Sequence, residues 1–310
     1  MKNKDKIKNI KNVLEYFLDH LKSCKLCPRE CGVNRLKGET GFCGTAKDLV
    51  VYTAFIHKGE EPPITGEKGS GTIFFSGCNL KCIYCQNFKF SHRLEGKPVK
   101  KGDLAQVMID LQNKKAENIN LVTPTHFLPQ ILEALLIAYE KGLNIPIVYN
   151  SSGYEKPGVI ERLRGIIDIY LVDMKYYTPE AALLGSKTRD YPLYNRKAIL
   201  CMHNQKKEPV WQKNTLKKGL IIRHLILPGL TEESRQIIRW IKDIMPSAYI
   251  SLMSQYKPYF EAKNNPALDR RINYEEYASL AQLIENIGLE GWFQEFEPPD
   301  QLAGVYFKPF

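Results

Sequence analysis

The sequence predicts an α/β protein built around a parallel β-sheet. From Thr72 onward, apolar segments of strand length alternate with segments of helix length, a pattern typical of parallel sheets covered by helices. Six strand–helix units follow one another, which is too few for a closed eight-unit barrel. Polar residues follow the strands in unit after unit, and active sites of parallel α/β folds gather at the carboxyl ends of strands. We therefore expect a site at one end of the sheet.

The individual elements follow from apolar runs and from apolar residues spaced for one helix face. The expected strands cover residues 72–77, 119–123, 145–150, 168–173, 220–227 and 249–253. The expected helices cover residues 103–112, 129–139, 159–164, 179–184, 193–203, 232–244 and 274–287. Pro129 suits the first turn of its helix, and Pro228-Gly229 stops the fifth strand.

Segments outside the six units extend this body at both ends. A helix over residues 5–22 and an extended segment over residues 49–55 precede it. We expect three parts: residues 1–48 as a helix and cysteine-rich metal segment, 49–260 as the sheet-based body, and 261–310 as a last helix and aromatic cap. The aromatic residues that would flank the mouth of the barrel or cap it are Trp292, Phe293, Phe296, Tyr306, Phe307 and Phe310.

A three-cysteine loop follows the first of the six strands. Cys78, Cys82 and Cys85 have the spacing C-x3-C-x2-C, so three thiolates within eight residues reach one small volume, which suits an iron–sulfur cluster. A [4Fe–4S] cluster bound this way has one iron without a local protein ligand. Either a fourth ligand comes from elsewhere, or the open iron binds a substrate or cofactor. A structural zinc knuckle or buried free thiols are the alternatives.

A second cysteine set lies upstream, with the spacing C-x2-C-x3-C-x11-C. Cys24, Cys27, Cys31 and Cys43 are enough to complete a tetrahedral zinc site or a closed iron–sulfur cluster. The surrounding segment has little apolar material on which to fold without metal. Spacing does not decide between zinc and iron. A four-cysteine site has no open position, so we expect a structural, electron-transfer or partner-docking role.

Composition limits the class of protein. No stretch approaches the roughly 20 apolar residues of a membrane helix, and no apolar signal core follows the basic start, so we expect a cytoplasmic protein without a membrane partner. Eight cysteines in such a chain are better explained as metal ligands than as disulfides. The net charge of +10 admits an acidic partner such as nucleic acid, but dispersed lysines favour a solvated basic face.

Polar side chains mark the ends of the predicted strands. The segments that follow them are Thr123-Pro124-Thr125-His126, Asn150-Ser151-Ser152-Gly153, Asp173-Met174-Lys175 and Gln255-Tyr256-Lys257-Pro258. Because successive side chains of a strand point to opposite faces, Asp173 and Lys175 would lie on one side of it. That placement suits a shared ligand or a surface ion pair. Arg223 and His224 alternate within the fifth strand, and we expect Arg223 to face the site because its fixed fork suits a carboxylate.

The three-cysteine loop, with Tyr84 before its third cysteine, resembles the signature of the radical S-adenosylmethionine (radical SAM) enzymes. The Asp173-Met174-Lys175 triplet, the Asn150 turn and the ending Leu227-Pro228-Gly229 resemble the branch related to pyruvate formate-lyase activating enzyme, in a sub-branch with an N-terminal four-cysteine segment. The resemblance implies a partial (β/α)6 TIM-like barrel. It also implies that the open iron chelates SAM and that the reduced cluster splits SAM into methionine and a 5′-deoxyadenosyl radical.

By the same resemblance, the residues that contact SAM are Tyr84, Gln86, Thr123, Thr125, Asn150, Ser152, Asp173, Lys175, Arg223 and Gln255. Two positions depart from the family. Thr123-Pro124-Thr125 stands where activating enzymes carry a Gly-Gly-Glu turn for the amino group of SAM, although an ammonium needs only acceptors. Gln255 stands where a histidine often follows the sixth strand.

The resemblance further implies an oxidoreductase with an electron donor such as flavodoxin or ferredoxin, and a substrate that is a backbone glycine of a partner protein. Two alternatives remain. One is a radical SAM enzyme that modifies RNA or a small molecule. The other is a non-catalytic protein in which both cysteine sets bind iron–sulfur or zinc.

Overall fold

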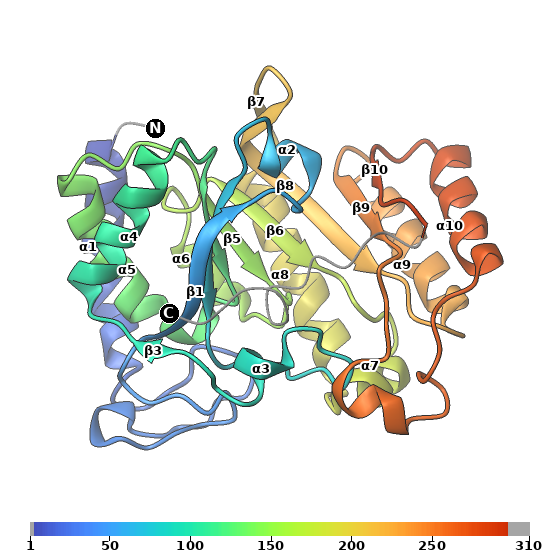
Figure 1. Cartoon of the computed structure of the whole chain (residues 1–310), viewed down its shortest axis with the longest axis horizontal. Helices are drawn as coiled ribbons and strands as arrows, with labels where there is room; N and C mark the ends of the chain where they lie inside the picture. The colour runs from blue at the N-terminus through green and yellow to red at the C-terminus, as the bar shows by residue number, and fades with distance from the viewer. Residues whose placement is uncertain (1–2, 297–310) are drawn as a thin grey trace.

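A computed structural model describes residues 3–296, which form a ten-stranded sheet with helices packed against it (Figure 1). The strands are β1 (Val50–His57), β2 (Ser70–Phe75), β3 (Lys97–Pro98), β4 (Ile119–Val122), β5 (Ile147–Ser151), β6 (Ile169–Asp173), β7 (Val210–Gln212), β8 (Thr215–Leu225), β9 (Tyr249–Met253) and β10 (Gly291–Phe293). The helices are α1 (Asn3–Asp19), α2 (Pro62–Thr65), α3 (Phe88–Ser91), α4 (Lys101–Asn113), α5 (Leu128–Glu140), α6 (Pro157–Arg162), α7 (Pro179–Ser186), α8 (Tyr191–Gln205), α9 (Thr231–Ile244) and α10 (Tyr274–Asn286).

The sheet confirms the six predicted parallel strands. Its order is β10-β9-β8-β6-β5-β4-β2-β1-β3, and every neighbouring pair from β2 to β10 is parallel. β1 and β3 add an antiparallel edge next to β2. Among the described residues the two edge strands, β3 and β10, do not pair with one another, so the sheet is an open, partial barrel.

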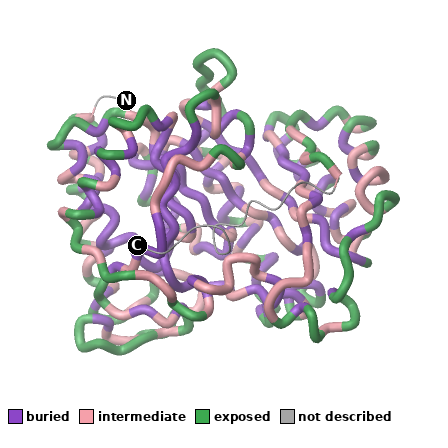
Figure 2. Tube along the Cα trace, viewed as in Figure 1, coloured by how far each residue is buried: buried purple, intermediate pink, exposed green. Residues whose placement is uncertain are grey.

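The strand sequences explain this arrangement. β2, β4 and β5 are buried along their whole length, as expected of parallel strands with both faces covered. Figure 2 shows the buried residues concentrated along the strands and the exposed ones in the outer loops. The helices pack in neighbouring pairs on the outside, α1 on α5, α5 on α4, α6 on α8 and α9 on α10. The other face of the strands is left to line an interior cavity.

The structure differs from the predicted elements at both ends of the sheet. β8 begins at Thr215 and forms a hairpin with β7, whereas the apolar run predicted a strand only from residue 220. Trp292 and Phe293, expected to flank the mouth of the barrel or to cap it, lie in β10 and pair in parallel with β9. Tyr306, Phe307 and Phe310 lie outside the described residues.

Two arginines fasten the cysteine-rich segment to the rest of the protein. Arg35 is fully buried and donates hydrogen bonds to the carbonyl oxygens of Ala46 and His126. Arg29 donates to the carbonyl oxygen of Asn79 at 3.0 Å and to Thr188 Oγ1 at 2.6 Å. The segment therefore packs directly against the three-cysteine loop. No helix in the described part of the chain is long and apolar enough to cross a membrane.

Candidate functional site

A cavity of about 420 Å³ lies on the inner face of the sheet and reaches the carboxyl ends of its parallel strands. Its volume falls within the range of pockets that hold drug-sized ligands. All three cysteines of the loop after β2 line it. All but one of the residues that the resemblance assigns to SAM also line it, namely Tyr84, Gln86, Thr123, Asn150, Ser152, Asp173, Lys175, Arg223 and Gln255.

The backbone of the three-cysteine loop requires specific conformations. Gly77 has a φ of 86°, and a Cβ there would lie 2.8 Å from the carbonyl oxygen of Cys43. Lys81 also has a positive φ, 55°, which turns the chain between the first two cysteines. Cys78 Sγ accepts the backbone N–H of Leu80 at 3.3 Å. N–H donors of this kind suit a ligand that carries negative charge, such as a thiolate.

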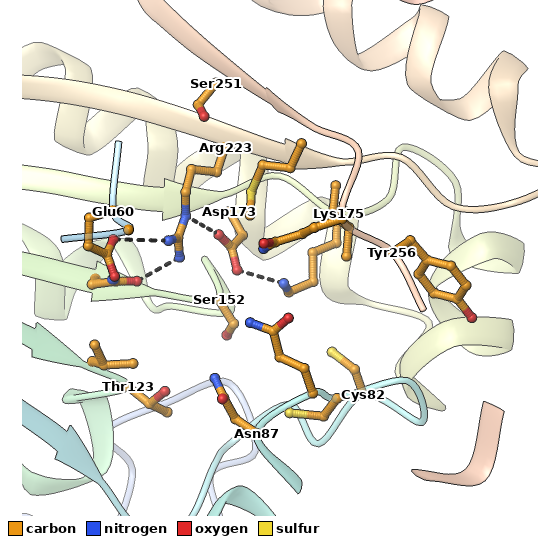
Figure 3. A pocket seen from close by; sticks show the side chains of 18 of the residues that line it. Glu60, Cys82, Asn87, Thr123, Ser152, Asp173, Lys175, Arg223, Ser251 and Tyr256 are labelled. Atoms are coloured by element: carbon orange, nitrogen blue, oxygen red, sulfur yellow. Dashed lines mark hydrogen bonds and ion pairs between the residues drawn. The ribbon is translucent and has the colours of Figure 1, made fainter. Parts of the chain in front are cut away.

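Opposite charges at the ends of β6 and β8 form a buried chain of ion pairs (Figure 3). Asp173 accepts from Lys175 Nζ at 2.6 Å and from Arg223 Nε at 2.8 Å, and Arg223 also donates to Asn150 Oδ1 at 2.6 Å. Burial alone would raise the pKa of Asp173, but the charges of Arg223 and Lys175 outweigh it and hold that pKa below its usual value. The carboxylate is therefore ionised and fixed in position.

Three features of the cavity wall indicate that it is shaped for a polar ligand. Ser152 Oγ and Asn87 Oδ1 are buried and have no hydrogen-bond partner, and both residues line the cavity. Buried polar atoms normally have partners. Thr123, a β-branched residue, has a φ of 58°, an uncommon strain that concentrates at binding and catalytic sites. A ligand with hydroxyl, amine and carboxylate groups such as SAM fits these donors and acceptors.

Thr125, the remaining residue that the resemblance assigns to SAM, does not line the cavity. Its side chain is buried and donates to Glu155 Oε1 at 2.6 Å. The chain forms a short 3-10 turn, η2 (Thr125–Phe127), directly after the Thr123–Pro124 step, and this turn directs the hydroxyl into the interior. Gln255 does line the cavity, and its side chain accepts from Gln294 Nε2 at 3.1 Å.

The two histidines near the strand ends have structural partners. His224 lies between the carbonyl oxygen of Met174 at 2.7 Å and Ser234 Oγ at 2.8 Å, and burial lowers its pKa to about 4. His126 contacts the carbonyl oxygen of Ser76 at 2.7 Å, and burial lowers its pKa to about 3. Arg223 lines the cavity, whereas His224 does not.

Several cavity residues were not foreseen from the sequence. Glu60 and Glu61, between β1 and α2, both line the cavity beside Arg223. Gln294 also lines it, next to Trp292 and Phe293 of β10, which were expected to flank the mouth of the barrel or to cap it. No sequence pattern marks the glutamate pair as part of a site, because acidic residues beside prolines in a short connection are ordinarily exposed.

The second cysteine set surrounds a separate, small cavity. Cys24, Cys27, Cys31 and Cys43 line it together with Arg29 and Arg35. Within residues 3–296, no three His, Cys, Asp or Glu side chains converge closely enough to hold a single metal ion. The three-cysteine loop shares this wider spacing.

Comparison with known proteins relates the chain to others of similar sequence. The sequence model of the Radical SAM superfamily matches residues 72–241. The Methanocaldococcus jannaschii protein MJ0674, described as uncharacterized, is 32% identical over 280 residues, which cover 87% of this chain and 76% of that protein. MJ1227 of the same organism, provisionally named a glycyl-radical enzyme activating enzyme, is 35% identical over 111 residues, or 35% of this chain and 44% of that protein.

Two solved structures show a weaker likeness. Streptococcus suis SuiB, bound to the precursor peptide SuiA, aligns with a TM-score of 0.48 and 12% identity over 74% of this chain and 52% of that chain. QueE from Escherichia coli aligns with a TM-score of 0.40 and 14% identity over 84% of this chain and 98% of that chain. At these scores neither structure informs the chemistry of the site.

Proposed function

This chain belongs to the radical SAM superfamily, and on that premise we propose that it cleaves SAM reductively and abstracts a hydrogen atom from a substrate. The observation that supports this proposal is a shared cavity. Cys78, Cys82 and Cys85 line the same 420 Å³ space as Asp173 and Lys175. Three thiol ligands with room beside them for a cofactor are the arrangement that an iron–sulfur cluster with one open iron needs.

When bound and reduced, a [4Fe–4S] cluster at these cysteines supplies the electron that splits SAM. The chain's own residues then hold and orient the cofactor. Asn150, Ser152 and Arg223 offer an amide, a hydroxyl and a guanidinium to its polar groups, and the ion pair between Asp173 and Lys175 keeps the charges at the strand ends in place. Such pre-organised positioning is what a protein contributes to cofactor chemistry.

The test is anaerobic reconstitution with iron and sulfide, followed by reduction and measurement of 5′-deoxyadenosine released from SAM. We expect release by the natural chain, and in Cys82→Ala we expect loss of 5′-deoxyadenosine together with about four irons, those of the cluster at the three-cysteine loop. Cys201→Ala is the matched control, because Cys201 lies on α8, outside both cysteine cavities. An intact cluster that does not cleave SAM, or zinc alone at both cysteine sets, would contradict the proposal.

We propose a protein glycine as the first substrate to test, because MJ1227 carries the activating-enzyme name over the 111 residues that match. The chain would then place a glycyl radical on a partner enzyme, with electrons from a donor such as flavodoxin or ferredoxin. Electron paramagnetic resonance of the partner after turnover detects that radical. A small molecule is the second candidate, because the cavity extends past Arg223 to the buried Glu60 and Glu61, a space that a slender molecule reaches more readily than a backbone loop.

We further propose that the N-terminal cysteines hold a second iron–sulfur cluster. Two features support the proposal: the four cysteines line one small cavity, and Arg29 ties their segment to the three-cysteine loop. The reconstituted chain should then bind about eight irons, against about four in Cys27→Ala, with Cys201→Ala unchanged. One zinc per chain that is lost in Cys27→Ala would show a structural zinc site instead.

A further inference from the structure

Two glutamates occupy the end of the cavity farthest from the cysteines. Glu60 and Glu61 follow β1, whose last residue, His57, pairs with the first residue of β2. They therefore enter the barrel from the amino ends of the parallel strands, whereas the cysteine loop follows the carboxyl end of β2. Figure 3 shows Glu60 on one side of Arg223. Asp173 and Cys82 lie on the other side of that arginine.

Both glutamates are buried and incompletely paired. Their side chains are 9% and 7% exposed, and Oε2 of each lacks a hydrogen-bond partner. Arg223 lies 3.6 Å from Glu60 Oε2 and 3.9 Å from Glu61 Oε1, and Ser251 donates to Glu61 Oε1 at 3.2 Å. A buried carboxylate oxygen without a partner is costly, so these oxygens are suited to a ligand that donates hydrogen bonds.

The charges around this pair leave an excess of negative charge. The charged side chains that line the cavity in residues 3–296 are Glu60, Glu61, Asp173, Lys175, Arg223 and Lys257. Lys175 binds Asp173 at 2.6 Å, so Arg223 is the cation shared between Asp173 and the two glutamates. Lys257 follows β9 at the opposite, carboxyl end of the sheet.

The titration of neighbouring groups is consistent with that excess. Burial raises the pKa of Glu60, and it raises that of Glu61 to about 7. His57 Nε2 lies 4.0 Å from Glu60, but burial lowers its pKa, so the histidine is neutral at pH 7. The raised pKa values show that burial makes two negative charges costly here, and a bound cation would reduce that cost.

We propose that Glu60 and Glu61 bind a protonated amine of the substrate where the connection between β1 and α2 lines the cavity. The inference rests on the proposed function, because it assigns the space beyond the SAM site to the hydrogen donor. The ammonium group would donate to the two unpartnered Oε2 atoms, while the rest of the substrate extends past Arg223 toward the cysteines. This assigns the substrate to slender, amine-bearing molecules, which is the second of the two proposed substrate classes and not the protein glycine.

The test uses n-butylammonium as the probe and n-butanol as its neutral counterpart of similar size. Each is titrated into the reconstituted natural protein at pH 7 with saturating SAM, and its affinity is measured by ligand-observed nuclear magnetic resonance. We expect the amine to bind at least about tenfold more tightly than the alcohol, because hydrogen bonds to ionised groups are the stronger kind. Equal affinities would overturn the proposal. So would displacement of the amine by SAM, since the glutamates would then serve the cofactor.

Variants locate the binding. Glu61→Gln keeps the size of the side chain and removes its charge, and it should reduce the preference for the amine by about tenfold. Glu67→Gln, an exposed residue in the same connection between β1 and β2, should leave it unchanged. An unchanged preference in Glu61→Gln would refute the assignment. The comparison of amine with alcohol in the natural protein stands even if that variant does not fold. Release of 5′-deoxyadenosine by the natural protein tests the proposed function separately, so either idea can fail alone.

Discussion

Replacement of Asp173 by asparagine tests the buried ion pairs at the centre of the site. Removal of one partner from a buried pair costs about 3–5 kcal/mol. Arg223 would keep Glu60 at 3.6 Å and Glu61 at 3.9 Å, so only Lys175 would be left without a carboxylate. We therefore expect a loss of about 3 kcal/mol, at the lower end of that range.

This loss converts into a shift of the melting temperature. Unfolding entropy is about 2.1 cal/mol/K per residue, or about 0.65 kcal/mol/K over 310 residues. A loss of about 3 kcal/mol then lowers the melting temperature by about 5 °C. Circular dichroism of the reconstituted protein measures it. Asp110→Asn, at an exposed position on α4, is the control and should change stability by less than about 0.5 kcal/mol.

The dependence on pH gives a second check. The folded pKa of Asp173 lies below its ordinary value of 3.8, so its stabilisation is present above pH 3.8 and is lost as the pH falls through the folded pKa. The difference between the natural protein and Asp173→Asn should be complete at pH 7 and should shrink only in strong acid. A melting temperature at pH 7 equal to that of the Asp110→Asn control would refute the reasoning.

Three further perturbations have definite expected outcomes. Gly77→Ala should lower the iron content of the reconstituted protein, because Gly77 has a positive φ and the added Cβ would lie 2.8 Å from the carbonyl oxygen of Cys43. Gly102→Ala is the control, since a Cβ there meets open space and the variant should bind iron normally. Equal iron in both variants would contradict this expectation. The free energy of unfolding should fall as the pH drops from 6.5 toward 4, because His224 has a folded pKa of about 4 against an ordinary 6.5. The unfolded state therefore binds more protons in this range, which costs up to about 3 kcal/mol of stability. Denaturant titrations should show a shallower pH dependence in His224→Asn than in the natural protein. Arg35→Met should lower the free energy of unfolding by about 1–3 kcal/mol, since it leaves the carbonyl oxygens of Ala46 and His126 without this donor. Limited proteolysis should then cut residues 20–49 faster than in the natural protein. An unchanged cleavage rate would show that Arg35 does not fasten the segment.

Local sequence features predicted much of the site. The spacing of Cys78, Cys82 and Cys85 brings three thiols together whatever the rest of the chain does, since so few residues separate them. Asp173 and Lys175 are two residues apart at a strand end, and the structure joins them at 2.6 Å. Thr125, which the resemblance assigns to SAM, lies instead in a 3-10 turn with its hydroxyl bonded to Glu155. Because side chains alternate along an extended chain, a shift of one residue is enough to turn a side chain away from the cavity.

The sequence by itself determined the six parallel strands, because each is a short apolar run that can be recognised from a few consecutive residues. It also determined the thiol loop and the polar strand ends that follow from that pattern. The tertiary structure alone decided which distant groups share one cavity. Glu60 and Glu61 meet Arg223 across about 160 residues of chain, and β10 adds Trp292 and Phe293 to the same wall. Those contacts arise from the order in which strands pair, and hydrophobic periodicity carries no information about that order.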